Sequence, residues 1–217
     1  MNDDSERSKI SRKEREFQAR RQEILEAATR LFAQKGYHGA SMSEIANEAE
    51  FSTGSLYNFF RNKEELYFTL LEEKIEALGS QINVVLESRG GVEEKLASFL
   101  TKVLSFFETE RDFFRIFSEQ RTQFELSAKG QFADVIHDKY EKYLGGMVLL
   151  MEQGIKEGLF VPLNPAELAL MFLGIMNTIL FLYVNSPEPY NLQDKSGQIL
   201  DVFFNGTRKR AVGEDKK

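Results

Sequence analysis

Small polar side chains are concentrated in one short segment of this 217-residue chain, residues 52–58. Serine, threonine and tyrosine hydroxyls and an asparagine amide can donate or accept hydrogen bonds to phosphate oxygens and base edges. Gly54 adds no side chain that would hold the backbone away from a sugar-phosphate wall. The segment therefore has the composition of a nucleic-acid contact, and its candidate contact residues are Ser52, Thr53, Gly54, Ser55 and Asn58.

Basic residues are concentrated near the N-terminus. Residues 7–21 contain seven lysines and arginines and two glutamates, a local charge of +5, although the whole chain carries −6. Because a phosphate backbone attracts local positive charge, we expect Arg12, Lys13 and Arg21 to contact DNA. Two alternatives remain open at this point: a solvated tail, and the basic arm of a helical adaptor that binds an acidic protein or a membrane surface rather than DNA.

Catalytic and metal-binding chemistry has little support in the sequence. The chain has no cysteine and two histidines, and it contains no glycine-rich phosphate loop, nucleophile elbow or HExxH helix. We therefore expect no catalytic residue, no metal site and no cofactor, and we expect that the protein is not an enzyme.

Export and membrane insertion are also not expected. The first 22 residues are polar where a secretory signal needs an apolar stretch. The longest apolar run, Leu168 to Val184, is interrupted by Asn177 and Thr178 and falls at or below the ~17–25 residues that span a bilayer. We interpret it as a buried helix and expect a cytoplasmic protein, which the lack of cysteine also fits.

Capping-box spacing, in which a serine or asparagine is followed three residues later by glutamate, occurs at Ser11, Ser41 and Asn62. The pattern predicts a first helix that ends at Gly36, a short second helix and a long helix after Asn62. Ser52 lies where an N-cap hydroxyl would begin a helix of about two turns. Since isolated helices shorter than ~12–15 residues are marginal in water, neighbouring elements must hold this one.

The order and spacing of these elements closely resemble the DNA-binding head of the TetR family over about residues 20–68. The resemblance is carried by Ile24-Leu25-Glu26-Ala27-Ala28, Gly36-Tyr37, Ser41-Met42-Ser43-Glu44-Ile45-Ala46, Ser52 to Phe60 and Lys63-Glu64-Glu65-Leu66. It implies a helix-turn-helix at about residues 43–60, with a recognition helix at 53–59.

The same resemblance assigns roles to individual residues. It implies that Tyr57 gives its hydroxyl to a phosphate and that Lys63 is a second phosphate anchor. Ser41 and Ser43, at the start of the supporting helix, complete the expected DNA-contact set. Two positions depart from the family pattern. Glu50 stands where the turn often has glycine, so a left-handed backbone there would cost ~1–2 kcal/mol, and Ala40 replaces a frequent hydroxyl residue.

Beyond about residue 70 the periodicity remains helical, over roughly 92–109, 110–127, 129–158, 165–185 and 192–205. The expected fold class is all-α, with an N-terminal three-helix helix-turn-helix head on a larger helical body that binds ligand and dimerises. The expected divisions are a head at 1–66, an effector-binding and dimerisation domain at 67–207, and a disordered tail at 208–217.

The helix from Pro165 to Val184 is apolar nearly all round, so we expect it to be buried from every side. Together with the helix Asp194 to Asn205, it could form half of a four-helix bundle across a two-fold axis, where the TetR family also dimerises. A symmetric homodimer would present two recognition helices ~34–36 Å apart to a palindromic operator. A monomeric bundle remains the alternative.

The many aromatic residues of the body, together with its methionines, suit a pocket for a small apolar or aromatic effector. The candidate ligand-binding residues are Phe106, Phe113, Phe117, Gln120, Arg121, Tyr140, Met147, Met176 and Asn177. The expected function is a DNA-binding transcriptional regulator, by the family's usual mode a repressor, that is released from its operator when the effector binds.

Overall fold

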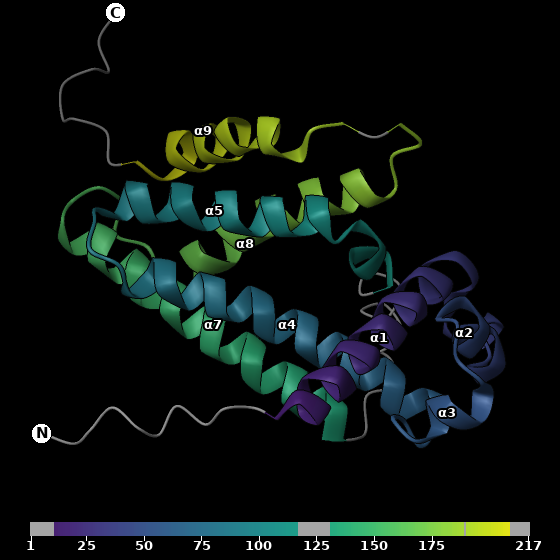
Figure 1. The fold of residues 1–217 in the computed structure, drawn as a ribbon. Helices are drawn as coiled ribbons and strands as arrows, with labels where there is room; N and C mark the ends of the chain where they lie inside the picture. The colour runs from purple at the N-terminus through teal and green to yellow at the C-terminus, as the bar shows by residue number, and fades with distance from the viewer. Residues whose placement is uncertain (1–10, 117–130, 189, 209–217) are drawn as a thin grey trace, which may run out of the picture. The chain divides into compact units, whose positions relative to one another are not determined.

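The computed structural model describes residues 11–116, 131–188 and 190–208, and these ranges are helical apart from their connections (Figure 1). The helices are α1 Arg12–Gly39, α2 Met42–Glu48, α3 Thr53–Tyr57, α4 Lys63–Glu87, α5 Val92–Thr109, α7 Gln131–Lys156, α8 Pro165–Val184, the 3-10 helix η1 Leu192–Lys195, and α9 Ser196–Thr207. Residues 111–116 are also helical. The expected all-α class is confirmed.

Internal contacts divide the chain into two compact units, Met1–Leu71, here called the head, and Glu72–Lys217, here called the body. The division falls inside α4, so this helix begins in the head and continues into the body. It lies a few residues beyond the boundary expected at 66.

The head is built on a core shared by its helices. In α1 the buried residues recur at helical spacing, α2 contributes Ile45 and Ala46, and α3 contributes Leu56. The predicted end of the first helix at Gly36 corresponds to a kink: Gly36 has φ 69, and residues 37–39 form a further turn before Ala40. Glycine adopts this positive φ without the steric cost that a side chain adds.

In the body, α5, α8 and α9 lie side by side and α7 packs along α8 (Figure 1). The inner face of α9 buries Ile199 and Phe203, and α8 buries Phe172, whose ring contacts Phe203 at a centroid distance of 5.1 Å. By length and composition α8 could cross a membrane. Its packing against α5, α7 and α9 accounts for the apolar residues on the side of α8 that faces these helices.

One expectation about α8 is wrong for the single chain. Leu170, Met171, Phe181 and Leu182 are exposed, so this helix is buried on one side only. Leu170 and Phe181, and likewise Met171 and Leu182, are eleven residues apart, close to three helical turns, which places the four on one continuous face of the helix together with Gly174.

The start of the predicted disordered tail is anchored. Arg208 forms an isolated bridge with Phe160, pairs with Glu93, and lies over the ring of Phe204 at 5.2 Å. Residues 209–217 lie outside the described residues, as does the second part of the helix expected at 110–127.

Candidate nucleic-acid interface

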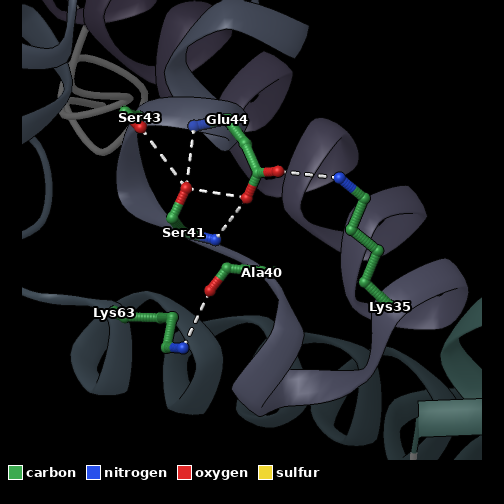
Figure 2. A network of polar contacts seen from close by, with 6 residues as sticks. All are labelled: Lys35, Ala40, Ser41, Ser43, Glu44 and Lys63. Carbon is green, nitrogen blue, oxygen red and sulfur yellow. Dashed lines mark hydrogen bonds and ion pairs between the residues drawn. The ribbon is translucent and has the colours of Figure 1, made fainter.

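The N-terminus of α2 is held by the predicted capping box. The Ser41 hydroxyl accepts a hydrogen bond from the Glu44 amide (3.3 Å), and the Glu44 carboxylate accepts from the Ser41 amide (2.9 Å). Lys35 of α1 donates to the other carboxylate oxygen at 2.7 Å (Figure 2). The hydrogen bond from Lys35, followed by those from Ser41, lowers the pKa of Glu44 to about 2. The network joins α2 to α1 through charged groups.

Both serines that were expected to contact DNA are exposed at this terminus. The Ser41 hydroxyl lies 3.3 Å from that of Ser43 and also donates to Glu44 at 2.7 Å (Figure 2). The Ser41 hydroxyl is therefore already engaged within the protein, whereas Ser43 has the freer hydroxyl of the two. Their contact with DNA stays a prediction.

Glu50, in the turn between α2 and α3, has the left-handed backbone conformation that was considered for it. Its φ is 60, and no other non-glycine residue in the described part of the chain has a positive φ. The Phe51 amide donates to the Ala46 carbonyl at 2.8 Å, which closes the turn around the strained residue. The Glu50 side chain is exposed, close in sequence to the recognition helix.

Helix α3 is short and depends on two supports. Leu56 is 0% exposed, and Ser52 accepts a hydrogen bond from the Ser55 amide at 3.0 Å. The hydroxyls of Ser52 and Ser55 also lie 2.8 Å apart, so each is engaged by the other. The cap satisfies an amide that the helix itself cannot pair.

The remaining candidate residues of α3 point outward. Thr53, Gly54 and Asn58 are exposed, and Tyr57 is 49% exposed. A Cβ added at Gly54 would meet nothing within 4 Å, so the protein's own packing does not require glycine there. The close approach of a molecule outside the chain, such as a DNA backbone, would explain the glycine at this position.

Lys63 has an unexpected set of partners. Its ammonium group donates to the carbonyls of Tyr37 (2.7 Å) and Ala40 (2.8 Å), and it lies 4.5 Å from the centre of the Tyr37 ring. Figure 2 shows the bond to Ala40, the residue that follows α1. Two of its three N–H groups therefore hold the first turn of α4 to the end of α1, which leaves one for the expected phosphate contact.

The expected DNA-contacting residues of the basic arm, Arg12, Lys13 and Arg21, belong to α1, whereas Arg7 and Lys9 lie outside the described residues. Arg12 pairs with Glu16 at 2.7 Å, Lys13 is exposed, and Arg21 lies over the Phe60 ring at 5.5 Å. The Ser11 hydroxyl caps the helix by accepting from the Glu14 amide. These charges are therefore carried on a helical extension rather than on a loose tail.

Four of the candidate ligand-binding residues are buried in the body, namely Phe106 on α5, Phe113, Met147 on α7 and Met176 on α8. The rings of Phe106 and Phe113 lie 6.0 Å apart, and Asn177 is half-buried on α8. Phe117, Gln120 and Arg121 lie outside the described residues. Tyr140 lies on α7, but its side chain is outside the described part of the chain.

Sequence analysis missed the contacts that join α1 to the rest of the head. These are the pairs Lys35 and Glu44, nine residues apart, Lys63 and Tyr37, 26 apart, and the stacked rings of Phe17 and Phe59, 42 apart. The position of Phe17, seven residues before the buried Ile24, was a usable signal for a contact on the same helix face.

Comparisons with known proteins agree with this geometry. Residues 24–70 match the model of bacterial regulatory proteins of the tetR family, and residues 89–181 match the model of a tetracyclin repressor-like C-terminal domain. The chain is 24% identical over 190 residues to the fatty acid metabolism regulator protein of Bacillus subtilis, covering 87% of this chain and 95% of that protein.

Solved structures share the fold. The ketosteroid transcriptional regulator KstR2 of Mycobacterium tuberculosis superposes with a TM-score of 0.74 at 24% identity, covering 88% of this chain and 96% of that one. AibR, solved in complex with isovaleryl coenzyme A and operator DNA, has a TM-score of 0.72 at 23% identity, covering 85% of this chain and 98% of that one.

Proposed function

Because this chain belongs to the TetR family of bacterial regulatory proteins, and is therefore a DNA-binding transcriptional regulator, we propose that it represses transcription from a palindromic operator as a homodimer. The observation that carries the proposal is the outward-facing side of α3. There Thr53, Gly54, Tyr57 and Asn58 are exposed while Ser52 and Leu56 hold the helix from behind. Such a helix fits a major groove ~12 Å wide.

The proposed dimer interface is the exposed apolar face of α8. A contiguous apolar face beside α9 is suited to burial against its own copy across a two-fold axis. Four helices, two from each chain, would then form a bundle, and the two recognition helices would meet half-sites one helical turn apart, ~34–36 Å. The exposed Val202 of α9 adds to the apolar surface available for this bundle.

We propose that the effector is a small apolar acyl compound, of the type carried as a coenzyme A thioester. The support comes from the relatives, one a fatty acid metabolism regulator and one solved with isovaleryl coenzyme A, and from the aromatic and methionine side chains of the body. The proposed contacts remain Phe106, Phe113, Phe117, Gln120, Arg121, Tyr140, Met147, Met176 and Asn177. A coupling of ~1–3 kcal/mol between effector and operator would change operator affinity about 5- to 150-fold.

The proposed role is regulatory rather than catalytic, and its proposed place is the cytoplasm, where the chromosome of a bacterium lies. The relatives of this chain are regulators. In the described ranges, no three histidine, aspartate or glutamate side chains are grouped so that they could hold a metal ion.

Selection of duplexes from a random pool tests the DNA-binding part of the proposal. The purified protein should recover one palindromic sequence, and Tyr57→Phe, which removes only the hydroxyl, should bind it more weakly while keeping the helical content of the parent protein. Tyr57→Ala should weaken binding further. Recovery of no preferred duplex at low salt would overturn the proposal and favour the adaptor.

The effector part has its own test on the selected operator. Long-chain and short-chain acyl-coenzyme A, free coenzyme A and the corresponding free acids are added to the preformed complex. Release by an acyl thioester but not by free coenzyme A supports the proposal. Release by none of them, while the operator is still bound, overturns the effector class and leaves the DNA-binding function standing.

A further inference from the structure

Helix α1 begins well before the region that the family model matches. The model match starts at residue 24, whereas α1 starts at Arg12, so about three turns precede the matched head. Nearly every side chain of residues 12–23 is exposed. This segment, here called the α1 extension, contributes almost nothing to the core. Core packing therefore does not explain why it forms a capped helix.

One aromatic contact fixes the α1 extension to the recognition unit. The rings of Phe17 and Phe59 are stacked, with centroids 4.7 Å apart and planes 25° apart. Phe59 lies two residues after the end of α3 and also meets Phe51, which lies two residues before its start, at 6.1 Å edge to face. One turn further along α1, Arg21 lies over Phe60. The extension is therefore held against the residues that follow the short recognition helix, one of which also meets Phe51 before it.

The basic residues of the extension fall into two sets according to their angle around the helix from Phe17, the residue that contacts Phe59. At about 100° per residue, Lys13 and Arg20 lie about 40° and 60° from Phe17 around the helix. Arg12 and Arg15 lie about 140° and 160° from Phe17, on the side of the helix away from that contact. Arg12 is about 80° to 100° around the helix from Lys13 and Arg20. Both Lys13 and Arg20 are exposed, two helical turns apart on the flank of the Phe17 contact.

The two carboxylates between Lys13 and Arg20 in sequence are engaged within the extension. Glu16 accepts from Arg12 at 2.7 Å, and Glu14 accepts from the side-chain amide of Gln18 at 2.9 Å. The flank thus presents two cations beside the recognition helix, in a chain whose total charge is −6. The phosphates of DNA are a dense row of negative charges next to a DNA-reading head. Because these two cations complement that charge, we infer that their partner is the DNA backbone.

We propose that Lys13 and Arg20 bind backbone phosphates outside the base pairs read by α3, and that Phe17, through Phe59, positions them there. The proposal rests on the proposed DNA-binding function. It implies that the operator extends beyond the base pairs that the recognition helix contacts. It also replaces the earlier expectation for Arg12, because Arg12 points away from the Phe17 contact and is paired with Glu16.

Two double variants with the same change of charge test the assignment of faces. Lys13→Gln/Arg20→Gln removes the proposed contacts, and Arg12→Gln/Arg15→Gln is the control on the opposite face. Affinity for the selected operator is measured across a salt series. Each phosphate contact adds about 0.9 to the slope of log K against log salt, so two contacts in each chain of a dimer predict a slope less steep by about 3.6 for the first variant. The control should leave the slope nearly unchanged.

Operator length gives the second readout. Trimming the base pairs outside the palindrome should weaken binding by the parent protein but not by Lys13→Gln/Arg20→Gln, because that variant has already lost the flanking contacts. Phe17→Ala, which changes no charge, should reproduce both effects while its helical content is retained, since Phe17 is already 40% exposed. Phe17→Leu should be intermediate.

An equal decrease of the salt slope in the two double variants would overturn the inference. It would indicate that the extension acts through its total charge rather than through contacts on one face. No change of slope in either variant would overturn it as well. Both results leave the proposed function intact as long as the parent protein still selects a palindrome, whereas failure of that selection is failure of the proposed function itself.

Discussion

The outward side of α3 in the head and the exposed side of α8 in the body are surfaces of opposite kind. Around α3, serine hydroxyls are engaged by backbone amides and by one another, so the helix keeps its shape before any partner arrives. On α8, Phe181 and Leu182 are exposed apolar side chains that this chain leaves uncovered.

The difference follows from what each partner supplies. DNA offers hydrogen-bonding groups at set positions, so a reading surface gains from being rigid and from having its own polar groups satisfied. A second copy of the chain offers apolar area, so the α8 face needs shape and hydrophobic surface rather than polar partners. Disturbing the α8 face should therefore change assembly, and disturbing the head should change local stability and affinity.

The largest effect is expected from a charge on the α8 face. Phe181→Arg should convert the dimer to a monomer, because burial of an unpaired charge in an apolar interface is unfavourable. Loss of the linked second half-site should lower operator affinity at least about 100-fold. Light scattering and operator titration measure the two consequences. The control is Val84→Arg on α4, an apolar residue that is 70% exposed and lies away from α8 in sequence. A dimeric Phe181→Arg protein would refute the interface.

A smaller effect is expected at the lysine that joins α4 to the end of α1. Lys63→Met removes two bonds from a charged donor to carbonyls, and hydrogen bonds to charged groups contribute about 1.5–3 kcal/mol. We expect the head to lose about 2 kcal/mol of unfolding free energy in a denaturant titration.

The salt dependence of the same variant separates its two roles. If Lys63 acts only by holding the start of α4, affinity falls and the salt slope stays the same. If its third N–H also contacts a phosphate, the slope becomes less steep by about 0.9 per chain. Lys63→Arg, which keeps the charge, is the matched control.

Next comes the strained turn before the recognition helix. Glu50→Gly should raise the unfolding free energy by about 1 kcal/mol, because glycine adopts a left-handed backbone without the steric cost of a Cβ. Glu50→Ala removes the same carboxylate but keeps the backbone strain. The difference in unfolding free energy between the two variants therefore measures the contribution of the strain alone. Equal stability of the two variants in chemical denaturation would argue against strain at this residue.

The smallest effect is a pH dependence at the N-terminus of α2. The folded pKa of Glu44 is lowered from 4.5 to about 2, chiefly by the hydrogen bond from Lys35. A carboxyl with a depressed folded pKa stabilises the folded state fully above its unfolded pKa, so this contribution is present above about pH 4.5 and is lost as the pH falls towards 2. The difference in thermal midpoint between the parent protein and Glu44→Gln should therefore shrink from pH 7 to pH 3.5. An unchanged difference would show that ionisation of Glu44 is not involved.

The starts of the helices could be predicted because their signals are local. Ser11, Ser41, Ser52 and Asn62 each accept the amide hydrogen bond that the spacing implied, from a residue three positions later. The helix expected to end at Gly36 continues by one kinked turn, and Lys63, far along the chain, binds the carbonyls of Tyr37 and Ala40 at the two ends of that turn.

The amino-acid sequence by itself determined the all-helical class, the helix-turn-helix and the chemistry of the recognition segment, since each depends on patterns that repeat within a turn or two of helix. Only the tertiary structure decided which groups are already engaged. Lys63 meets Tyr37 26 residues away, and Phe17 meets Phe59 although 42 positions separate them. Such pairs have no local signature, because they form only when the packing of α1, α3 and α4 brings distant segments within reach of a hydrogen bond or a stacked ring.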